Sequence, residues 1–285
     1  MGDVLAGNHA TWEFEPDAVL IRFERGIRAP KLFQTLRERR IPHEALASVA
    51  LVPGRRGTVV LHAVPRAGAD PLMEAAAGQL KEGCDPYRLV LPADRQTLAE
   101  YYAHELRARL GPERDEPAER FLVTAPEPPL HFKAYDGKAS FDGRNVSFRW
   151  SWTGASTAKW KAGDQTVAVS ELSGVEWRSP DAPDGCLRLV RPGDEPLPVQ
   201  ADQDPAAVVF GSGYGLVHES LPFAAAVLQA VRNATGAVPV PVRVGGRRDP
   251  ADIADRIRHL GELYQAGLVT DEEFSAKKAE LLAEL

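Results

Sequence analysis

The sequence predicts an α+β protein in which two similar β-rich domains, each closed by a C-terminal helix, precede a C-terminal two-helix hairpin. Three observations lead to this prediction. The first 232 residues contain an internal repeat, each repeat reads as short strands followed by one helix, and residues 249–285 carry two amphipathic helical patterns. The chain has 285 residues, of which 44% are hydrophobic and 26% charged. That composition is typical of a globular protein and excludes wholesale disorder.

The internal repeat is visible as matched strand and turn patterns. The matched positions stay near 126 residues apart until the loops diverge, which indicates duplication rather than chance, and a repeat has to be recognised before single motifs are interpreted. Three pairs of segments carry the match: Phe14–Arg22 with Phe141–Arg149, Ile41–Val49 with Val167–Val175, and Asp85-Pro86 with Asp204-Pro205.

Each copy begins with alternating apolar residues, as strands with one buried face do. Val19, Ile21 and Phe23 alternate behind a turn at Pro16-Asp17, whose counterpart is Asp142-Gly143. A second hairpin surrounds residues 53–57, and short late strands are expected at 87–91 and 208–210. The first copy then ends in a helix from about Arg95 to Leu110, stopped by Gly111-Pro112.

Strands followed by one C-terminal helix is the element order of pleckstrin-homology-like (PH-like) folds, so we expect a PH-like β-barrel or roll in each copy. A small bent sheet cannot bury its inner face alone, and the helix supplies the missing surface. The expected boundaries are residues 8–111 for the first domain, 112–130 for a Pro-rich connector and 131–233 for the second domain. A flexible linker at 234–248 and the helical hairpin at 249–285 complete the chain.

The hairpin at 249–285 carries most of the net charge of −6, because it has nine acidic residues and four basic ones. Asp249-Pro250 is a helix start, and Thr270 with Glu273 forms a capping box for the second helix. Two short helices bury too little surface to be stable alone. We therefore expect self-association or a protein partner through their apolar side: Ile253, Ile257, Leu260, Leu263, Phe274, Leu281 and Leu282.

The hairpin sequence, Leu260-x-x-Leu-Tyr-x-x-Gly-Leu-Val-Thr-x-Glu-Glu-Phe-x-x-Lys-Lys-x-x-Leu-Leu282, resembles the SHOCT family, the short C-terminal domain of many bacterial proteins. That resemblance implies a module for oligomerisation or anchoring. Residues 11–232 resemble a tandem actinobacterial domain of unknown function, number 4429, which implies no catalytic residues. Four segments carry this second resemblance: Phe141-Asp142-Gly143, Leu172-x-Gly-Val-Glu-Trp177, Gly68-Ala69-Asp70-Pro71-Leu72 and Asp85-Pro86-Tyr87. The first copy departs from the pattern only at the turn Glu15-Pro16-Asp17.

The candidate binding residues lie in one basic segment of each copy. Residues 22–41 contain seven basic and two acidic side chains, and residues 149–161 contain three basic side chains, no acidic ones and three tryptophans. Cationic and aromatic side chains together suit phosphorylated headgroups, acidic peptides or an anionic membrane surface. The candidates are Arg25, Arg28, Lys31, Lys159, Trp160 and Lys161. The competing interpretation is a solvated edge strand whose arginines deter aggregation while the tryptophans pack inward.

No pattern in the chain predicts catalysis, a cofactor or a metal. The seven histidines are scattered singly, and the run Gly211–Gly215 lacks the ending of a phosphate-binding loop. Cys84 and Cys186 are widely separated and are expected to be reduced thiols. The N-terminus does not read as a secretory signal, and the most apolar window, residues 221–231, is too short to span a bilayer. We expect a cytoplasmic bacterial protein.

Three functions remain open on the sequence alone. The favoured one is a non-enzymatic binding or scaffold protein with two interaction domains and an assembly hairpin. The second is peripheral binding to anionic lipid through the basic segments. The third is an unrecognised hydrolase, since catalytic residues are defined by geometry rather than order. Nucleic acid is disfavoured, because residues 1–248 carry a net charge of only −1 and no nucleic-acid-binding motif is present.

Overall fold

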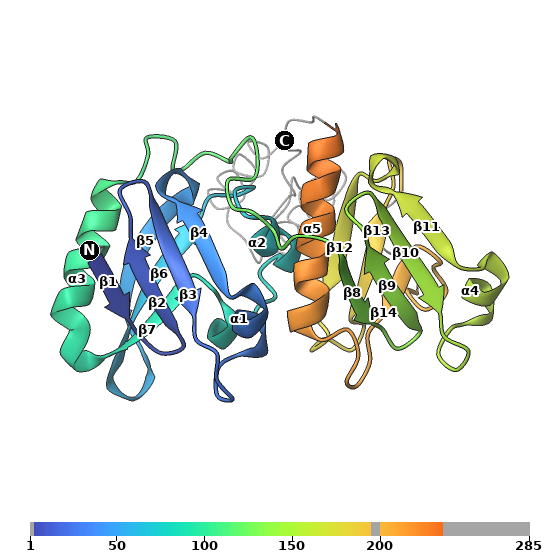
Figure 1. Ribbon diagram of the computed structural model, residues 1–285, viewed down its shortest axis with the longest axis horizontal. Coiled ribbons are helices and arrows are strands. Elements are labelled where there is room, and N and C mark those ends of the chain that lie inside the picture. The colour runs from blue at the N-terminus through green and yellow to red at the C-terminus, as the bar shows by residue number, and fades with distance from the viewer. Residues whose placement is uncertain (1–2, 195–199, 236–285) are drawn as a thin grey trace, which may run out of the picture. The chain divides into compact units, whose positions relative to one another are not determined.

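A computed structural model describes residues 3–194 and 200–235 of the chain (Figure 1). The predicted linker and helical hairpin, including every candidate oligomerisation residue, lie outside the described residues. The first copy contains an antiparallel four-stranded sheet in the order β1 (Asp3–Ala6), β2 (Ala10–Phe14), β3 (Ala18–Phe23) and β4 (Glu38–Pro42). A second, three-stranded sheet has the order β5 (Leu46–Pro53), β6 (Thr58–Pro65) and β7 (Arg88–Pro92). Its helices are α1 (Lys31–Leu36), α2 (Pro71–Ala76) and the terminal α3 (Gln96–Ala108).

The second copy repeats this arrangement. Its four-stranded sheet contains β8 (Leu130–Lys133), β9 (Gly137–Phe141), β10 (Asn145–Trp150) and β11 (Gln165–Ala168). Its three-stranded sheet contains β12 (Gly174–Arg178), β13 (Cys186–Val190) and β14 (Ala207–Val209). The helices are α4 (Thr157–Ala162) and the terminal α5 (Val217–Thr235). The predicted order of strands followed by a C-terminal helix is confirmed in both copies, and the α+β class with it.

The strands form where the sequence alternates. Ala10, Trp12 and Phe14 of β2 point to the core while the residues between them are half-buried, which is the period of a strand with one covered face. The turn between β9 and β10 is built by Asp142, whose carboxylate accepts hydrogen bonds from the backbone N–H groups of Arg144 and Asn145, each at 2.7 Å. Such Asx turns explain why the predicted Asp-Gly dipeptide starts a hairpin.

The expected barrel is not closed. In each copy the two hydrogen-bonded sheets are separate, and in the first copy a backbone bridge between Asn8 and Val90 connects them. The chain reverses at this point, where Gly7 donates to the carbonyl of Ala10, so the ladder between β1 and β7 cannot extend. The two sheets of the second copy are joined at the corresponding place, where the N–H of Tyr135 donates to the carbonyl of Val209.

Three short helices were missing from the predicted element order. α1, α2 and α4 have six residues each, too few for an apolar period to stand out. α2 nevertheless has a clear start, because Asp70 caps it by accepting from Leu72 N–H and Pro71 occupies its first turn. Its counterpart region in the second copy contains residues that the structure does not describe.

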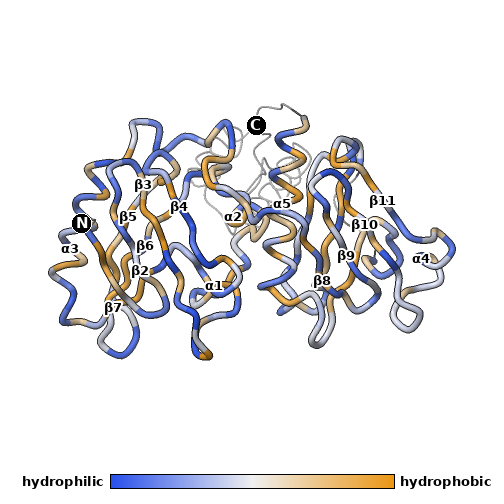
Figure 2. Tube along the Cα trace, in the orientation of Figure 1, coloured by the Kyte–Doolittle hydropathy of each residue, from blue (hydrophilic) through white to orange (hydrophobic). Residues whose placement is uncertain are grey.

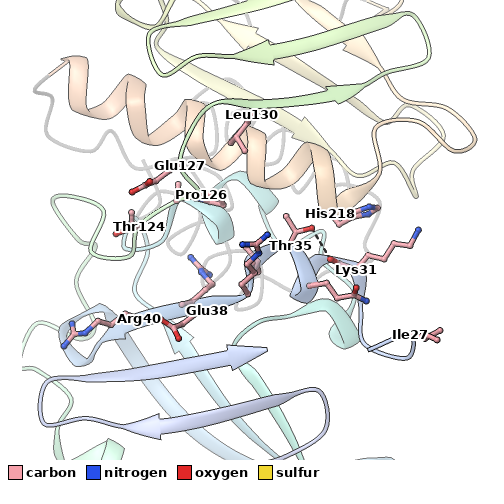
Figure 3. A pocket seen from close by; sticks show the side chains of 15 residues that line it. Ile27, Lys31, Thr35, Glu38, Arg40, Thr124, Pro126, Glu127, Leu130 and His218 are labelled. Atoms are coloured by element: carbon pink, nitrogen blue, oxygen red, sulfur yellow. Dashed lines mark hydrogen bonds between the residues drawn. The ribbon is translucent and has the colours of Figure 1, made fainter. Parts of the chain in front are cut away.

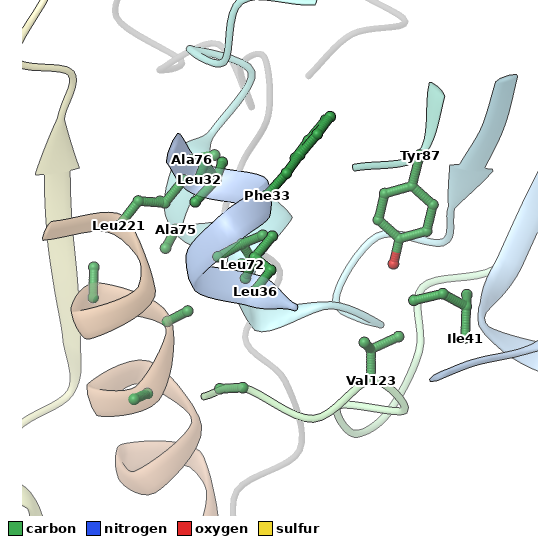
Figure 4. Close-up of a cluster of buried hydrophobic side chains, with 14 of the residues drawn as sticks. Leu32, Phe33, Leu36, Ile41, Leu72, Ala75, Ala76, Tyr87, Val123 and Leu221 are labelled. Atoms are coloured by element: carbon green, nitrogen blue, oxygen red, sulfur yellow. The ribbon is translucent and has the colours of Figure 1, made fainter. Parts of the chain in front are cut away.

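Helix α5 joins the two copies into one hydrophobic core. It packs on β12 and β8 of its own copy and on α1 and α2 of the first copy. Figure 4 shows Leu221 of α5 beside Leu32 of α1 and Ala75 and Ala76 of α2. Several small residues in α5, among them Ala224 and Ala225, are completely buried and allow this close helix packing. In the hydropathy colouring of Figure 2, α5 contains more apolar residues than α3, in which polar and apolar stretches alternate.

The predicted connector is bound to this core rather than hanging as a free tether. The N–H groups of Leu122 and Val123 both donate to the carbonyl of Ala69, which precedes α2. The amide oxygen of Gln229 in α5 accepts from the N–H of Ala125 at 2.8 Å. These bonds leave the two copies little freedom to move against each other.

Candidate functional site

The first basic segment divides into paired and unpaired cations. Arg39 is buried and forms a bidentate ion pair with Asp70, which also accepts from the hydroxyl of Tyr87. Arg22 pairs with Glu13 and Glu38, and Arg40 with Glu15 and Asp17. The remaining four cations are exposed, and their side chains form no hydrogen bond or ion pair with the described residues. They are Arg25, Arg28, Lys31 and Arg37.

Three of these unpaired cations surround an apolar loop tip. Residues 24–30 connect β3 to α1, and Ile27 in this loop is fully exposed. The corresponding loop of the second copy, residues 151–156 between β10 and α4, presents Trp152 with 85% of its surface exposed. In Figure 1 both loops lie at the same edge of the described residues, below the ends of β3 and β10. Exposed apolar residues are ordinary when scattered, but an exposed apolar tip at the same loop of both copies, flanked by Arg25 and Arg28 in the first, indicates a contact surface.

Trp160 and Lys161 lie on α4 beside the second tip. Trp160 is 43% exposed and meets Trp152 edge to face, with ring centroids 5.5 Å apart. Lys161 is exposed, and its side chain forms no ion pair with the described residues. The structure therefore places Arg25 and Arg28 on one loop with Lys31 at the adjoining start of α1, and Trp160 and Lys161 near the other loop.

Lys159 was predicted to lie on the binding surface, but the structure buries it. Its side chain is 0% exposed, pairs with the buried carboxylate of Asp136 and donates to the carbonyl of Ala207 at 2.8 Å. Its ammonium also lies 5.0 Å from the centroid of the Trp150 ring. Desolvating a lysine is costly unless its donors are satisfied, and here the fold satisfies them. The sequence offers no signal that separates Lys159 from Lys161, because only the third residue of α4 faces inward.

A cleft of about 1090 Å³ lies between α1 and β4 of the first copy and a facing wall formed by connector residues 124–127, Leu130 of β8 and His218 of α5 (Figure 3). Its walls include Lys31, Gln34 and Arg37 on one side, Glu127 and Leu130 on the other, and His218 at the start of α5. Burial lowers the pKa of His218, and the nearby positive charge of Lys31 lowers it further against the opposing effect of Glu219. Sequence reasoning identified Lys31 but missed Arg37 and His218, which line one cleft only because the two copies pack together.

Other candidate groups are structural. Cys84 and Cys186 are free thiols, and burial raises the pKa of Cys186 to about 11, which keeps it protonated at neutral pH. Gly215 has φ +64° and lies so close to the Phe210 ring that a side chain would collide with it, so the glycine-rich run is a tight turn. Within residues 3–194 and 200–235, no group of three or more metal-ligating side chains occurs. No helix in those residues is long and apolar enough to cross a membrane.

Comparison with known proteins identifies two families. A family model described as Domain of unknown function (DUF4429) matches residues 12–107 and 139–228, one match for each copy. A second, described as Short C-terminal domain (SHOCT), matches residues 255–282. No curated protein matches the chain significantly.

Proposed function

The chain belongs to the DUF4429 family, followed by a SHOCT segment, and we propose that it is a non-enzymatic binding protein with two fused PH-like interaction domains. The observation that carries this proposal is helix α5, which is buried against elements of both copies and joins them in one compact unit. A rigid pair presents two surfaces at a fixed spacing, so two weak contacts add without loss of orientational freedom. The proposal includes a cytoplasmic location.

We assign assembly or docking to residues 249–285. The support is the SHOCT match together with the amphipathic pattern of the sequence. Light scattering of the full chain against a 1–248 truncation tests this assignment. We expect the full chain to form oligomers that the truncation does not, and Leu263→Asp to imitate the truncation. If both proteins are monomers over a wide concentration range, self-association is excluded, and docking to a partner protein remains the proposed role of residues 249–285.

A second candidate function is contact with an anionic membrane surface. Ile27 and Trp152 are exposed at corresponding loops, and five exposed candidate residues lie around them: Arg25, Arg28, Lys31, Trp160 and Lys161. Apolar tips can enter the headgroup region while the cations bind lipid phosphates, and the two contributions add. The same loop in each copy contributes one anchor, so a rigid pair would bind a flat surface with both.

Co-sedimentation with vesicles of phosphatidylglycerol and phosphatidylcholine tests the membrane candidate. We expect Ile27→Ser with Trp152→Ser to weaken binding by about tenfold for each side chain, from the apolar surface no longer buried. Leu98→Ser with Tyr101→Ser is the matched control, because these exposed apolar residues lie on α3. Equal effects of the two double variants, or sedimentation with phosphatidylcholine alone, would remove this candidate.

A further inference from the structure

The cleft is an open groove large enough to hold a small molecule. Its volume of about 1090 Å³ slightly exceeds that of a typical ligand pocket, roughly 300–1,000 Å³. It is walled by elements of both copies, which α5 and the connector hold in place.

The charges that line the cleft are not balanced within it. Arg39 pairs with Asp70, Arg40 with Glu15 and Asp17, and Glu38 with Arg22, so these lining charges are already neutralised. Lys31 and Arg37 have no such partner among the described residues. Figure 3 shows His218 and Lys31 at one end of the cleft and Glu127 at the other. The carboxylate of Glu127 forms no ion pair with the described residues. At the end near His218, Lys31 is the cation without a partner among the described residues, and the Glu219 carboxylate lies 3.8 Å from Nε2 of His218.

Arg37 keeps a side chain where the backbone favours glycine. It follows α1 with φ 59° and ψ −66°, a strained conformation for any residue with a Cβ atom. The residue that follows α4 at the same place in the second copy is Gly163, with φ 71°. The duplicated fold thus accepts glycine here, and the first copy retains an arginine whose guanidinium lines the cleft. This internal comparison points to a role for the side chain itself.

We propose that the cleft binds a small organic phosphate, held by Lys31, Arg37 and His218. Lys31 and Arg37 stand at opposite ends of α1, about 9 Å apart along the helix axis, which suits an elongated ligand such as a diphosphate. Guanidinium and ammonium groups bind phosphate oxygens with charge-assisted hydrogen bonds, and Gln34 and Thr124 offer neutral polar groups beside them. The second copy has no equivalent, because Thr157 replaces Lys31 and Gly163 replaces Arg37. This proposal does not depend on the membrane contact of the loop tips.

Two probes distinguish a soluble phosphate from a lipid headgroup. Calorimetric titration with pyrophosphate measures the first, and co-sedimentation with vesicles containing phosphatidic acid measures the second. Saturable binding of pyrophosphate assigns the site to a soluble ligand. Binding to the vesicles alone assigns it to a headgroup where Arg37→Gly weakens that binding, and vesicle binding that Arg37→Gly leaves unchanged belongs to the loop tips and counts against the cleft. Trp152→Ser lies outside the cleft and should leave pyrophosphate binding unchanged even where it weakens vesicle binding.

Arg37→Gly is the decisive variant, because it removes the charge while relieving the backbone. We expect the dissociation constant to rise about tenfold or more, with a melting temperature equal to or above that of the wild type. Arg56→Gly is the matched control: Arg56 is exposed, has φ 55° and does not line the cleft. Lys31→Gln should weaken binding in the same direction. Equal effects of Arg37→Gly and Arg56→Gly, or the absence of saturable binding to both probes, would overturn the proposal.

Discussion

The two copies share one strand order but fill one corresponding place in different ways. In the first copy Phe33 of α1 stacks on Phe23, the last residue of β3, with ring centroids 4.5 Å apart. In the second copy the same positions hold Lys159 and Trp150, and Asp136 stands where the first copy has His9. The fold accepts either a stack of apolar rings or an ion pair with satisfied hydrogen bonds. Each solution depends on several residues together, and half of one solution is worse than either.

The terminal helices differ as well. α3 has one buried face, and it exposes Leu98 and Tyr101 on the other. α5 is longer, contains more small residues, and is covered by its own sheet on one side and by α1 and α2 on the other. A duplicated helix thus became the joint between the copies, because its second face found a partner within the chain.

Breaking the ion pair of the second copy should have the largest effect. Asp136→Ala leaves the ammonium of Lys159 buried without a counter-charge, and we expect a loss of about 3–5 kcal/mol of unfolding free energy in urea titration. Adding Lys159→Met removes the unpaired charge and should recover most of that loss. The exposed pair of Arg178 and Asp184 is the control, since Asp184→Ala should change stability little. If the double variant were less stable than Asp136→Ala, the comparison with Phe33 would fail.

Weakening the joint between the copies should have the next largest effect. Arg232 in α5 donates to the carbonyl of Gly68 at 3.0 Å and to Glu74 of α2 at 2.9 Å, and lies over the ring of Phe121. Arg232→Ala should cost about 2 kcal/mol, since it leaves a largely buried carboxylate without its cation. Arg232→Lys keeps the positive charge but loses the planar guanidinium, so its unfolding free energy should lie between those of the wild type and Arg232→Ala.

The pH dependence of Arg232→Ala has a defined sign. Burial raises the pKa of Glu74 above its usual value, and Arg232 opposes that rise. Without the arginine the folded-state pKa rises further above the unfolded one. The folded state then binds more protons than the unfolded chain, so the loss of stability should grow as pH rises through the folded-state pKa. A smaller loss at neutral pH than in mild acid would contradict this account.

Substituting the residue that follows α1 and the residue that follows α4 should change the unfolding free energy moderately and in opposite directions. Arg37→Gly should raise the unfolding free energy by about 1 kcal/mol, because it relieves a positive φ. Gly163 has φ 71° and ψ 178°, a region nearly restricted to glycine, so Gly163→Ala should cost about 1–3 kcal/mol. Thermal unfolding of both variants would show the expected opposite shifts, and a loss for Arg37→Gly would mean that its side chain stabilises the fold.

The smallest predicted effect concerns His43, whose counterpart is Val169. Burial lowers the pKa of His43, and its Nε2 is buried without a hydrogen-bond partner among the described residues. Because the folded-state pKa lies below the unfolded value, the unfolded chain takes up the proton first, and stability should fall as pH drops below about 6.5. His43→Val should flatten this dependence in urea titrations between neutral pH and mild acid. An unchanged slope would exclude His43 as its source.

Much of the fold follows from local patterns. The alternation around Val19 and Ile21, the Asp142-Gly143 turn and the stop at Gly111-Pro112 each predict an element that the structure contains. The short helices α1, α2 and α4 did not follow, because six residues give no readable period. The expected PH-like barrel or roll stays a prediction: the structure contains two separate sheets in each copy and no closed barrel among the described residues, because pairing between sheets depends on residues distant in sequence, such as Asn8 and Val90.

The candidate site shows the same limit more sharply. Residues 22–41 are recognisably basic in sequence, yet Arg39 is a buried partner of Asp70 whereas Arg25 and Arg28 are exposed. Lys159 and Lys161 differ by two positions on one helix and point to opposite environments. Charge composition located the two basic segments, but it could not show which of their cations are buried in ion pairs and which are exposed.

The sequence by itself determined the duplication, the strand and turn order, the terminal helices and the SHOCT segment, because these depend on residues close together in the chain. The tertiary structure decided which cations are neutralised, which apolar tips remain exposed, and that α5 joins the copies and encloses a cleft with Arg37 and His218. Burial and ion pairing depend on residues distant in sequence, such as Lys159 with Asp136 and Arg232 with Glu74. Such pairings arise only when the whole core is packed.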